Sequence, residues 1–254
     1  MKIIALDAGH GLYTAGKEIT LNGYPKTKEW FLNDRINDRV EELLADYDCK
    51  VIRVGDTTGK KDISLANRVK AANNIGAIVY IATHHDSGVA GGSGGGTTVF
   101  YCSVSSARKA QAQKLYDSVV SQTGLVGNRS SKVQKKGFYV IKHTKMPAFL
   151  IENGFMDSTT DVPIILSPEH AENTAQGILN FLVKEYSLEK KMPKPSVLST
   201  LYDDLKEDCD LLASAGIINS PDYWAQGGGY SDSNTVLLIK KFAAYVRGQE
   251  NDTK

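Results

Sequence analysis

The chain has 254 residues, of which 41% are hydrophobic and 23% charged, so it has enough apolar material to bury a sizeable core. Its formal net charge of +1 gives no support to a nucleic-acid-binding or membrane-surface protein, and we expect neither a nucleic-acid partner nor membrane insertion. The odd number of cysteines, Cys49, Cys102 and Cys209, argues against a disulfide framework or a thiolate zinc site and favours buried free thiols.

Residues 1–186 alternate short β-branched runs with longer segments of helical period. This pattern is typical of an α/β domain in which a mainly parallel, mixed sheet is flanked by helices. The strands are expected at residues 2–6, 51–54, 77–83, 98–102, 138–142 and 148–151.

Helices are expected between these strands. The first runs from Glu29 to about residue 47, because its apolar residues recur at helical spacing on one face. Residues 64–73 and 106–122 show a similar pattern. The last helix of the domain begins at Ser167, since Ser-Pro-Glu supplies an N-cap, a proline at the first helical position and an early acid.

A charged segment with two prolines, residues 187–197, indicates a linker. Residues 198–254 then form a second, small α-helical domain, with one helix ending at Gly216 and another at about 234–246. A glycine run, residues 91–96, lacks the Lys-Ser/Thr of a phosphate-binding loop. We interpret it as a flexible loop at the edge of a substrate groove.

Two expected strands end in histidine. His10 follows the apolar run IIAL and lies between two glycines, and His84-His85-Asp86 follows a strand of mainly apolar residues. Because ligands gather at the carboxyl ends of parallel strands, imidazoles converging there indicate a metal site. The alternative for each histidine, a structural or solvent-facing side chain, remains open at this point.

Carboxylates accompany these histidines. Glu152 follows the four apolar residues of AFLI, and a buried carboxylate is costly unless it is paired, ligating or catalytic. Glu29 stands at the start of a helix, where the helix dipole alone favours an acid. The spacing of His10, Glu29, His84 and Glu152 fits no local metal motif. Evidence for a metal site therefore has to come from all four positions taken together.

That assembled pattern resembles the type 3 family of zinc-dependent N-acetylmuramoyl-L-alanine amidases. Five segments match the family's motifs in order: LDAGHG (6–11), EWFLN (29–33), SLANRVKAAN (64–73), ATHHDS (82–87) and MPAFLIENGFMDSTTD (146–161). The resemblance covers about residues 1–185. It implies an enzyme that hydrolyses the amide between N-acetylmuramic acid and L-alanine in bacterial peptidoglycan, its partner macromolecule, and so lyses the cell wall.

The resemblance also implies roles for particular residues. His10, Glu29 and His84 take the positions of the Zn2+ ligands, and Glu152 takes that of the catalytic carboxylate. The helix at 64–73 takes the position of a structural marker without a role in the chemistry. Ala8, Asp86 and Asp157 depart from the usual residues without removing a ligand. The Arg and Asp that the family has after the second strand are loosely matched by Arg53 and Asp56.

Other polar residues are expected around this site. His85, Asp86, His143 and Asn153 are expected to support the metal ligands or to contact substrate, with His143 at the end of a strand lining the cleft. His170, in the first turn of a capped helix, is expected at the surface.

The module 198–254 occupies the position of a cell-wall-binding domain, and its role is open between wall anchoring and formation of a homo-oligomer. Tyr223, Trp224 and Tyr230 are its expected sugar-stacking residues, with a core of a small helical domain as the alternative.

Three rival interpretations remain: a zinc peptidase of the same fold that cuts another peptidoglycan amide, a wall-binding protein without catalysis, and, least favoured, a purely structural protein. The N-terminus MKIIALDAGHG is too short and polar for a signal peptide. We therefore expect synthesis in the cytoplasm and action on the wall after release, as for a phage endolysin of a clostridium-like host or an autolysin freed by lysis.

Overall fold

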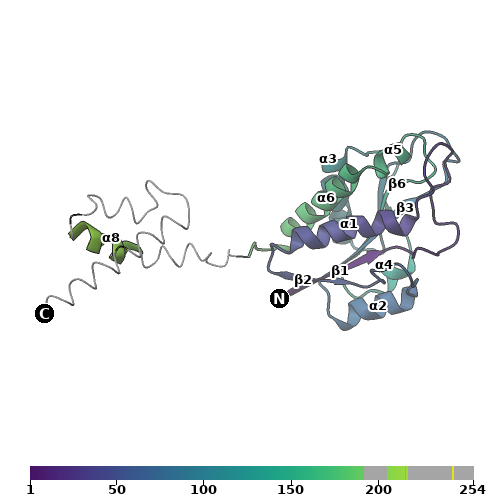
Figure 1. Cartoon of the computed structure of the whole chain (residues 1–254). Coiled ribbons are helices and arrows are strands. Elements are labelled where there is room, and N and C mark those ends of the chain that lie inside the picture. The colour runs from purple at the N-terminus through teal and green to yellow at the C-terminus, as the bar shows by residue number, and fades with distance from the viewer. Residues whose placement is uncertain (192–204, 215, 217–241, 243–254) are drawn as a thin grey trace. The chain divides into compact units, whose positions relative to one another are not determined.

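Six strands form one sheet in the computed structural model, which describes residues 1–191, 205–214, 216 and 242. Their order across the sheet is β2-β1-β3-β6-β4-β5 (Figure 1). The strands are β1 (Lys2–Ala8), β2 (Cys49–Arg53), β3 (Val79–Asp86), β4 (Thr97–Tyr101), β5 (Val133–Lys135) and β6 (Ala148–Phe155).

The four strands β2, β1, β3 and β6 are parallel to one another, whereas β4 is antiparallel to β6 and β5 is parallel to β4. The expected mixed, mainly parallel sheet flanked by helices is therefore confirmed. Because β1, β3 and β6 are adjacent and parallel, their carboxyl ends lie at the same edge of the sheet.

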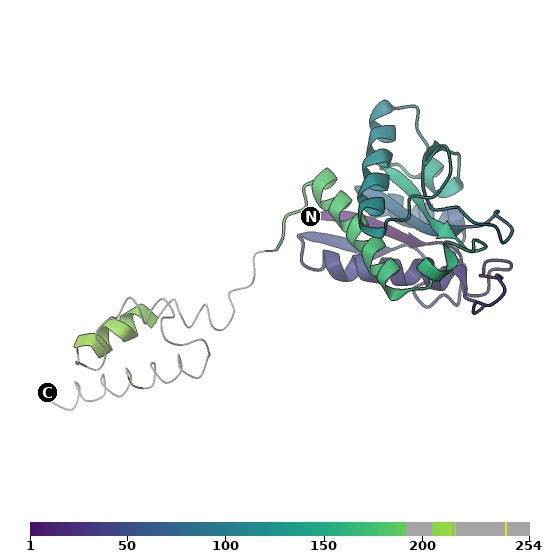
Figure 2. The same cartoon turned by 90° about the horizontal axis from the view of Figure 1, so that it is seen from above.

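Helices cover both faces of the sheet (Figures 1 and 2). In the first unit they are α1 (Glu29–Leu44), α2 (Leu65–Asn74), α3 (Ser106–Thr123), α4 (Tyr139–His143), α5 (Val162–Ile165) and α6 (Pro168–Tyr186). Ile4 and Leu6 of β1 pack in one apolar cluster with residues of α1, α3 and α6. Ala5, which points to the other face, packs in a second cluster with residues of α2 and α4.

One element differs from the prediction and two were not expected. The segment 138–142, predicted as a strand, forms the short helix α4, and the strand beside it is β5, which the prediction omitted. Val140 and Ile141 of α4 are buried, so their apolar character reflects packing of a helical turn against the sheet rather than a strand. The four-residue helix α5 was also not predicted.

The chain divides into two compact units, Met1–Lys191 and Met192–Lys254. The first unit extends beyond α6 because Asp48 N donates to Glu189 O (2.8 Å) and Lys191 N donates to Asp46 O (2.8 Å). In the second unit the described helix is α8 (Leu205–Ser214), which lies within the helix expected to end at Gly216. The helix expected at 234–246 lies almost wholly outside the described residues. In the described part of the chain, no helix is long and apolar enough to span a bilayer.

Candidate metal centre

The carboxyl ends of three neighbouring strands carry the polar residues singled out from the sequence. β1 leads into His10, β3 contains His84 near its end, and β6 contains Glu152. His84 pairs in register with Glu152, and Gly9 N donates to Thr83 O (3.0 Å) on the other side of β3. The strand order β1-β3-β6 therefore brings together residues from distant parts of the chain.

The loop that carries His10 has an uncommon backbone conformation. His10 has a φ of +67°, in the left-handed region that residues other than glycine rarely adopt. A Cβ on the preceding Gly9 would lie 2.1 Å from the His84 ring, so only glycine fits there. The Arg68 guanidinium donates to the carbonyls of Ala8 (2.7 Å) and His10 (2.8 Å) and fixes this loop.

Arg68 itself is 1% exposed and forms an ion pair with Asp7, which also accepts a hydrogen bond from the Tyr80 hydroxyl. Burial disfavours the charged form of Arg68, but Asp7 outweighs this effect and raises the pKa of Arg68. The sequence prediction assigned the helix of Arg68 a structural role without noticing this contact. Asp7 was the available signal, because an acid inside an apolar strand requires a buried partner.

His10, Glu29 and His84 form a compact cluster in which one potential ligand atom of each lies within 4.8 Å of the others. Glu29 is the first residue of α1 and reaches both imidazoles: its Oε2 lies 3.3 Å from His10 Nε2 and its Oε1 lies 3.1 Å from His84 Nδ1. The two rings are perpendicular, with centroids 5.1 Å apart.

This cluster fits a divalent metal ion. Glu29 is only 1% exposed, yet its Oε2 makes no hydrogen bond. Burial raises the pKa of Glu29, but the two neighbouring imidazoles of His10 and His84 outweigh it, so the net pKa is well below its usual range and the carboxylate is ionised. A buried anionic oxygen and two imidazoles directed at one place are a donor set that Zn2+ prefers.

Glu152 lies beside this cluster with its Oε2 buried and without a hydrogen-bond partner. Burial raises the pKa of Glu152 to about 8; His84 opposes this rise, whereas Asp86 and Glu29 add to it. A carboxyl group with such a pKa can both take up and release a proton near neutral pH.

Two further residues from the sequence prediction lie behind the cluster. His85 is 3% exposed, and its Nδ1 lies 2.8 Å from the side-chain oxygen of Asn33. Burial, assisted by the neighbouring His170 and Arg35, lowers the pKa of His85 to about 3, so the imidazole is neutral near pH 7. Asn153 donates from its side chain to His84 O (3.1 Å).

The expectation that His170 lies at the surface was wrong. His170 is 3% exposed, and its Nε2 lies 3.1 Å from Asn153 O. The first turn of α6 packs against β6 at this point. His170 is therefore buried, although its place at the start of a capped helix predicted exposure to solvent. His170 thereby supports the strand that carries Glu152.

The side-chain contacts of His143 and Asp86 are with residues outside the cluster. His143 is exposed at the end of α4, and its ring lies against Tyr139 with centroids 4.3 Å apart. Its expected position at a strand end was therefore wrong, whereas its expected contact with substrate stays a prediction. Asp86 accepts from Arg129 (2.8 Å), whose guanidinium also lies 4.5 Å from the centre of the Phe155 ring. Arg129 had no place in the sequence prediction.

The glycine run is anchored rather than loosely connected. Gly95 N donates to the side chain of Asn128 (3.0 Å), Gly96 N donates to Asp161 (2.7 Å), and a Cβ on Gly95 would lie 2.5 Å from Phe155. Close packing of backbone therefore explains these glycines. The cysteine prediction holds in part: Cys209 is buried, whereas Cys49 and Cys102 are half-buried free thiols.

A pocket of about 400 Å³ opens directly beside the cluster. His10 and His84 form one wall, and Leu65 of α2 and Val140 of α4 contribute apolar surface. Its other lining residues are Asp7, Gly9, Asp62, Ile63, Ser64 and Arg68. The cluster is therefore reachable from outside through a cavity large enough for part of a peptide or sugar substrate.

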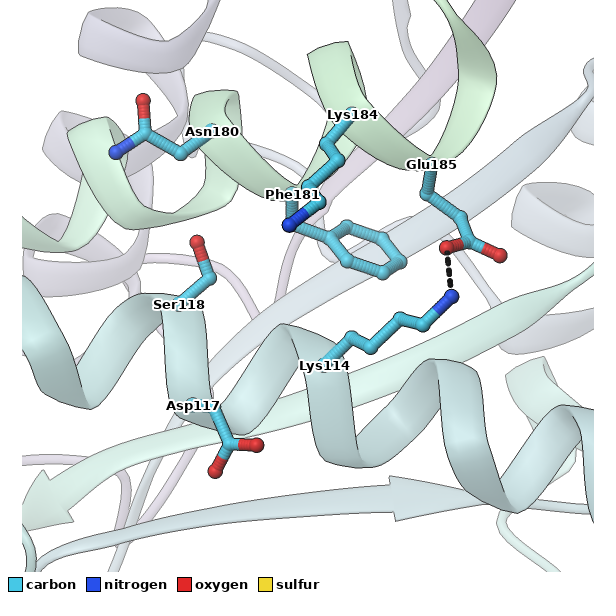
Figure 3. Close-up of a pocket in the computed structure, with 7 residues that line it drawn as sticks. All are labelled: Lys114, Asp117, Ser118, Asn180, Phe181, Lys184 and Glu185. Atoms are coloured by element: carbon cyan, nitrogen blue, oxygen red, sulfur yellow. Dashed lines mark hydrogen bonds and ion pairs between the residues drawn. The ribbon is translucent and has the colours of Figure 1, made fainter.

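A second cavity, of about 460 Å³, lies between α3 and α6 (Figure 3). Phe181 forms part of its lining, and Lys114 pairs with Glu185 across it (2.8 Å). The cavity is lined by the C-terminal half of α6, whereas His170 stands in the first turn of that helix. No group of the metal cluster lines it.

The fold is that of known peptidoglycan amidase domains. The catalytic domain of CwlV, an N-acetylmuramoyl-L-alanine amidase from Bacillus (Paenibacillus) polymyxa var. colistinus, superposes with a TM-score of 0.65 at 26% identity, over 74% of this chain and 100% of that one. An N-acetylmuramoyl-L-alanine amidase from Clostridium difficile 630 has the same fold, with a TM-score of 0.64 at 24% identity over 73% of this chain and 97% of that one.

Residues 4–184 match the family model Amidase_3, N-acetylmuramoyl-L-alanine amidase, and the chain belongs to this family. It is 29% identical to the N-acetylmuramoyl-L-alanine amidase CwlM of Bacillus licheniformis over 195 residues, which are 74% of this chain and 70% of that protein. It is 28% identical to the sporulation-specific N-acetylmuramoyl-L-alanine amidase of Bacillus subtilis (strain 168) over 187 residues, 74% of this chain and 69% of that protein.

Tyr223, Trp224 and Tyr230 lie outside the described residues, so their expected part in wall binding stays a prediction. If a full-length Trp224→Ala variant bound purified cell walls as strongly as the wild type, this result would argue against a part of Trp224 in wall binding.

Proposed function

We propose that the protein is a zinc-dependent hydrolase of the amide between the lactyl group of N-acetylmuramic acid and L-alanine of the peptidoglycan stem peptide. The observation that carries this proposal is the convergence of His10, Glu29 and His84 beside an open pocket. Two histidines and one glutamate are a catalytic zinc set that leaves a coordination position for water and substrate. Family membership supplies the substrate class.

In this proposal Glu152 moves the protons of the reaction. His10, Glu29 and His84 would hold the zinc ion, which would supply Lewis-acid activation of water and of the scissile carbonyl. Glu152 accepts a proton from the attacking water, whose oxygen forms a bond to the carbonyl carbon. As the carbon–nitrogen bond breaks, Glu152 returns that proton to the leaving amine, so the products are a lactyl carboxyl group and the free amine of L-alanine.

The surroundings of Glu152 suit this double role. Without a neighbouring metal ion, the pKa of Glu152 is raised to about 8. A bound metal ion would place a positive charge beside Glu152 and favour the ionised form, which accepts a proton. Neutral His85 and the arginine–aspartate pair of Arg68 and Asp7 hold the neighbouring strand ends without taking part in proton transfer.

Replacing Glu152 by Gln tests this assignment. The change removes the proton acceptor but keeps the shape, so we expect hydrolysis to fall by about 10²- to 10⁴-fold while zinc content and thermal stability stay near the wild type. Loss of turbidity of purified cell walls reports lysis, and mass analysis of the fragments identifies the bond.

Glu169→Gln is the matched control, because Glu169 is an exposed acid on α6 and its replacement should leave the activity unchanged. Undiminished hydrolysis by Glu152→Gln would refute the catalytic role. Release of a terminal amino acid without a new lactyl carboxyl group would instead identify the rival peptidase activity, and absence of any product in the wild type would identify a binding protein.

We further propose that this hydrolysis lyses the wall after the protein leaves the cytoplasm, as expected of an endolysin. The proposal rests on the sequence expectation alone, since the named relatives are bacterial. Lysis of intact producing cells before their membrane is permeabilised would contradict it.

A further inference from the structure

A chain of buried polar contacts lies behind the metal cluster and involves two residues with no part in the proposed chemistry. Asn33 and His85 are 0% and 3% exposed. The side-chain nitrogen of Asn33 lies 3.2 Å from Gly9 O and 3.5 Å from Glu29 Oε1, both of which are acceptors. The amide group of Asn33 is thereby oriented with its nitrogen toward the cluster and its oxygen toward His85.

This orientation also settles the tautomer of His85. The Asn33 oxygen lies 2.8 Å from His85 Nδ1, and because a carbonyl oxygen only accepts, Nδ1 carries the proton and donates it. The backbone amide of His85 donates to Glu29 Oε1 as well (3.2 Å). His85 therefore reaches the same carboxylate oxygen twice, once directly through its backbone and once through Asn33.

We propose that His85 is a positioning residue for the metal-binding carboxylate: its Nδ1–H holds the Asn33 amide, which in turn holds Glu29 Oε1. The inference rests on the proposed zinc site and deepens it. With Oε1 held by these donors and by His84 Nδ1, the carboxylate is oriented so that Oε2, which makes no hydrogen bond, faces the side of His10. Contacts of this kind behind metal ligands set affinity, and their loss typically costs 10- to 100-fold.

The surroundings of the His85 ring suit this role. Its ring is in edge contact with the His170 ring, with centroids 6.3 Å apart, and Arg35 contributes a positive charge nearby. Protonation of His85 would add a second proton donor at Nε2, a buried atom without a hydrogen-bond partner. The imidazole thus acts as a fixed donor and not as an acid or base.

The test measures zinc affinity of the full chain by competition with a chromophoric chelator, using the variants His85→Leu and His85→Asn. Leucine fills the volume but donates no hydrogen bond, so we expect zinc to bind about 10- to 100-fold more weakly. Asparagine places a donor nitrogen where Nδ1 stood, and it should restore affinity to within about 3-fold of the wild type. His143→Leu, at an exposed histidine, is the control and should bind like the wild type.

A second comparison keeps the proposal testable if His85→Leu folds poorly. Asn33→Ala removes the same contact from the other side, so it should weaken zinc binding by about 10- to 100-fold, and adding His85→Asn to it should change the affinity by no more than about 2-fold. The positioning role alone would be overturned if His85→Leu bound zinc as tightly as the wild type. It would also be overturned if His85→Asn bound zinc as weakly as His85→Leu. A wild-type chain that binds no zinc would overturn the proposed function together with this inference.

Discussion

At the scale of single residues, the site depends on buried charges that are paired. Arg68 joins Asp7 of β1 to the carbonyl groups of Ala8 and His10, so one side chain supports both the sheet and the loop of a proposed ligand. Breaking such a pair leaves the partner charge buried and uncompensated.

Arg68→Met should therefore lower the free energy of unfolding by about 3–5 kcal/mol, as measured by chemical denaturation. Arg39→Met, which removes an exposed arginine paired with Glu172, is the matched control and should leave stability near the wild type. Adding Asp7→Asn to Arg68→Met should recover part of the loss. A change in Arg68→Met as small as that in Arg39→Met would show that the buried pair does not stabilise the fold.

Residue-scale prediction from the sequence succeeded where a polar side chain interrupts an apolar strand. Glu152, His10 and His84 were visible in this way, and the structure places them together. Glu29 could be identified only by resemblance to the family, because an acid at a helix start is ordinary. His170 was misplaced, since burial of one side chain in a first helical turn depends on which strand that turn contacts.

At the scale of elements, helices with capping signals were predicted well and short elements were not. Ser167 accepts from His170 N (3.1 Å) and Ser64 accepts from Asn67 N (3.3 Å), as N-caps do. The run FYVIK at 138–142 has the composition of a strand but forms α4, because the packing of the whole sheet outweighs local propensity over a single helical turn. The three residues of β5 are too few for a periodic signal.

The contact between α6 and β6 predicts a loss of stability in acid. Burial lowers the pKa of His170 to about 4, opposed by its hydrogen bond to Asn153 O, whereas an unfolded histidine has a pKa near 6.5. The unfolded chain therefore binds more protons between these values. The contribution of His170 to stability is complete above about pH 6.5 and is lost as the pH falls toward about 4, by roughly 3 kcal/mol.

Denaturant unfolding with a chelator present, at several pH values from 7 to 4, measures this loss. His170→Asn removes the titrating group and should show a shallower decline of the unfolding free energy with falling pH. Parallel curves for the wild type and the variant would rule out His170 as the source.

At the scale of the whole molecule, the site exists because three parallel strands place their carboxyl ends side by side. No spacing along the chain indicated that His10, Glu29 and His84 would meet, and only the order β1-β3-β6 together with the start of α1 accounts for it. The fold class followed from alternating strand and helix patterns, whereas the strand order could not be derived from periodicity. The function followed from the assembled set of residues and from the family.

The most direct measurement is the metal content of the purified full-length protein together with its activity before and after metal removal. We predict one zinc ion per chain, loss of peptide release from purified peptidoglycan after chelation, and recovery of that activity when zinc is added back. Hydrolysis that continues at the same rate in protein shown to be free of metal would contradict the proposed role of His10, Glu29 and His84.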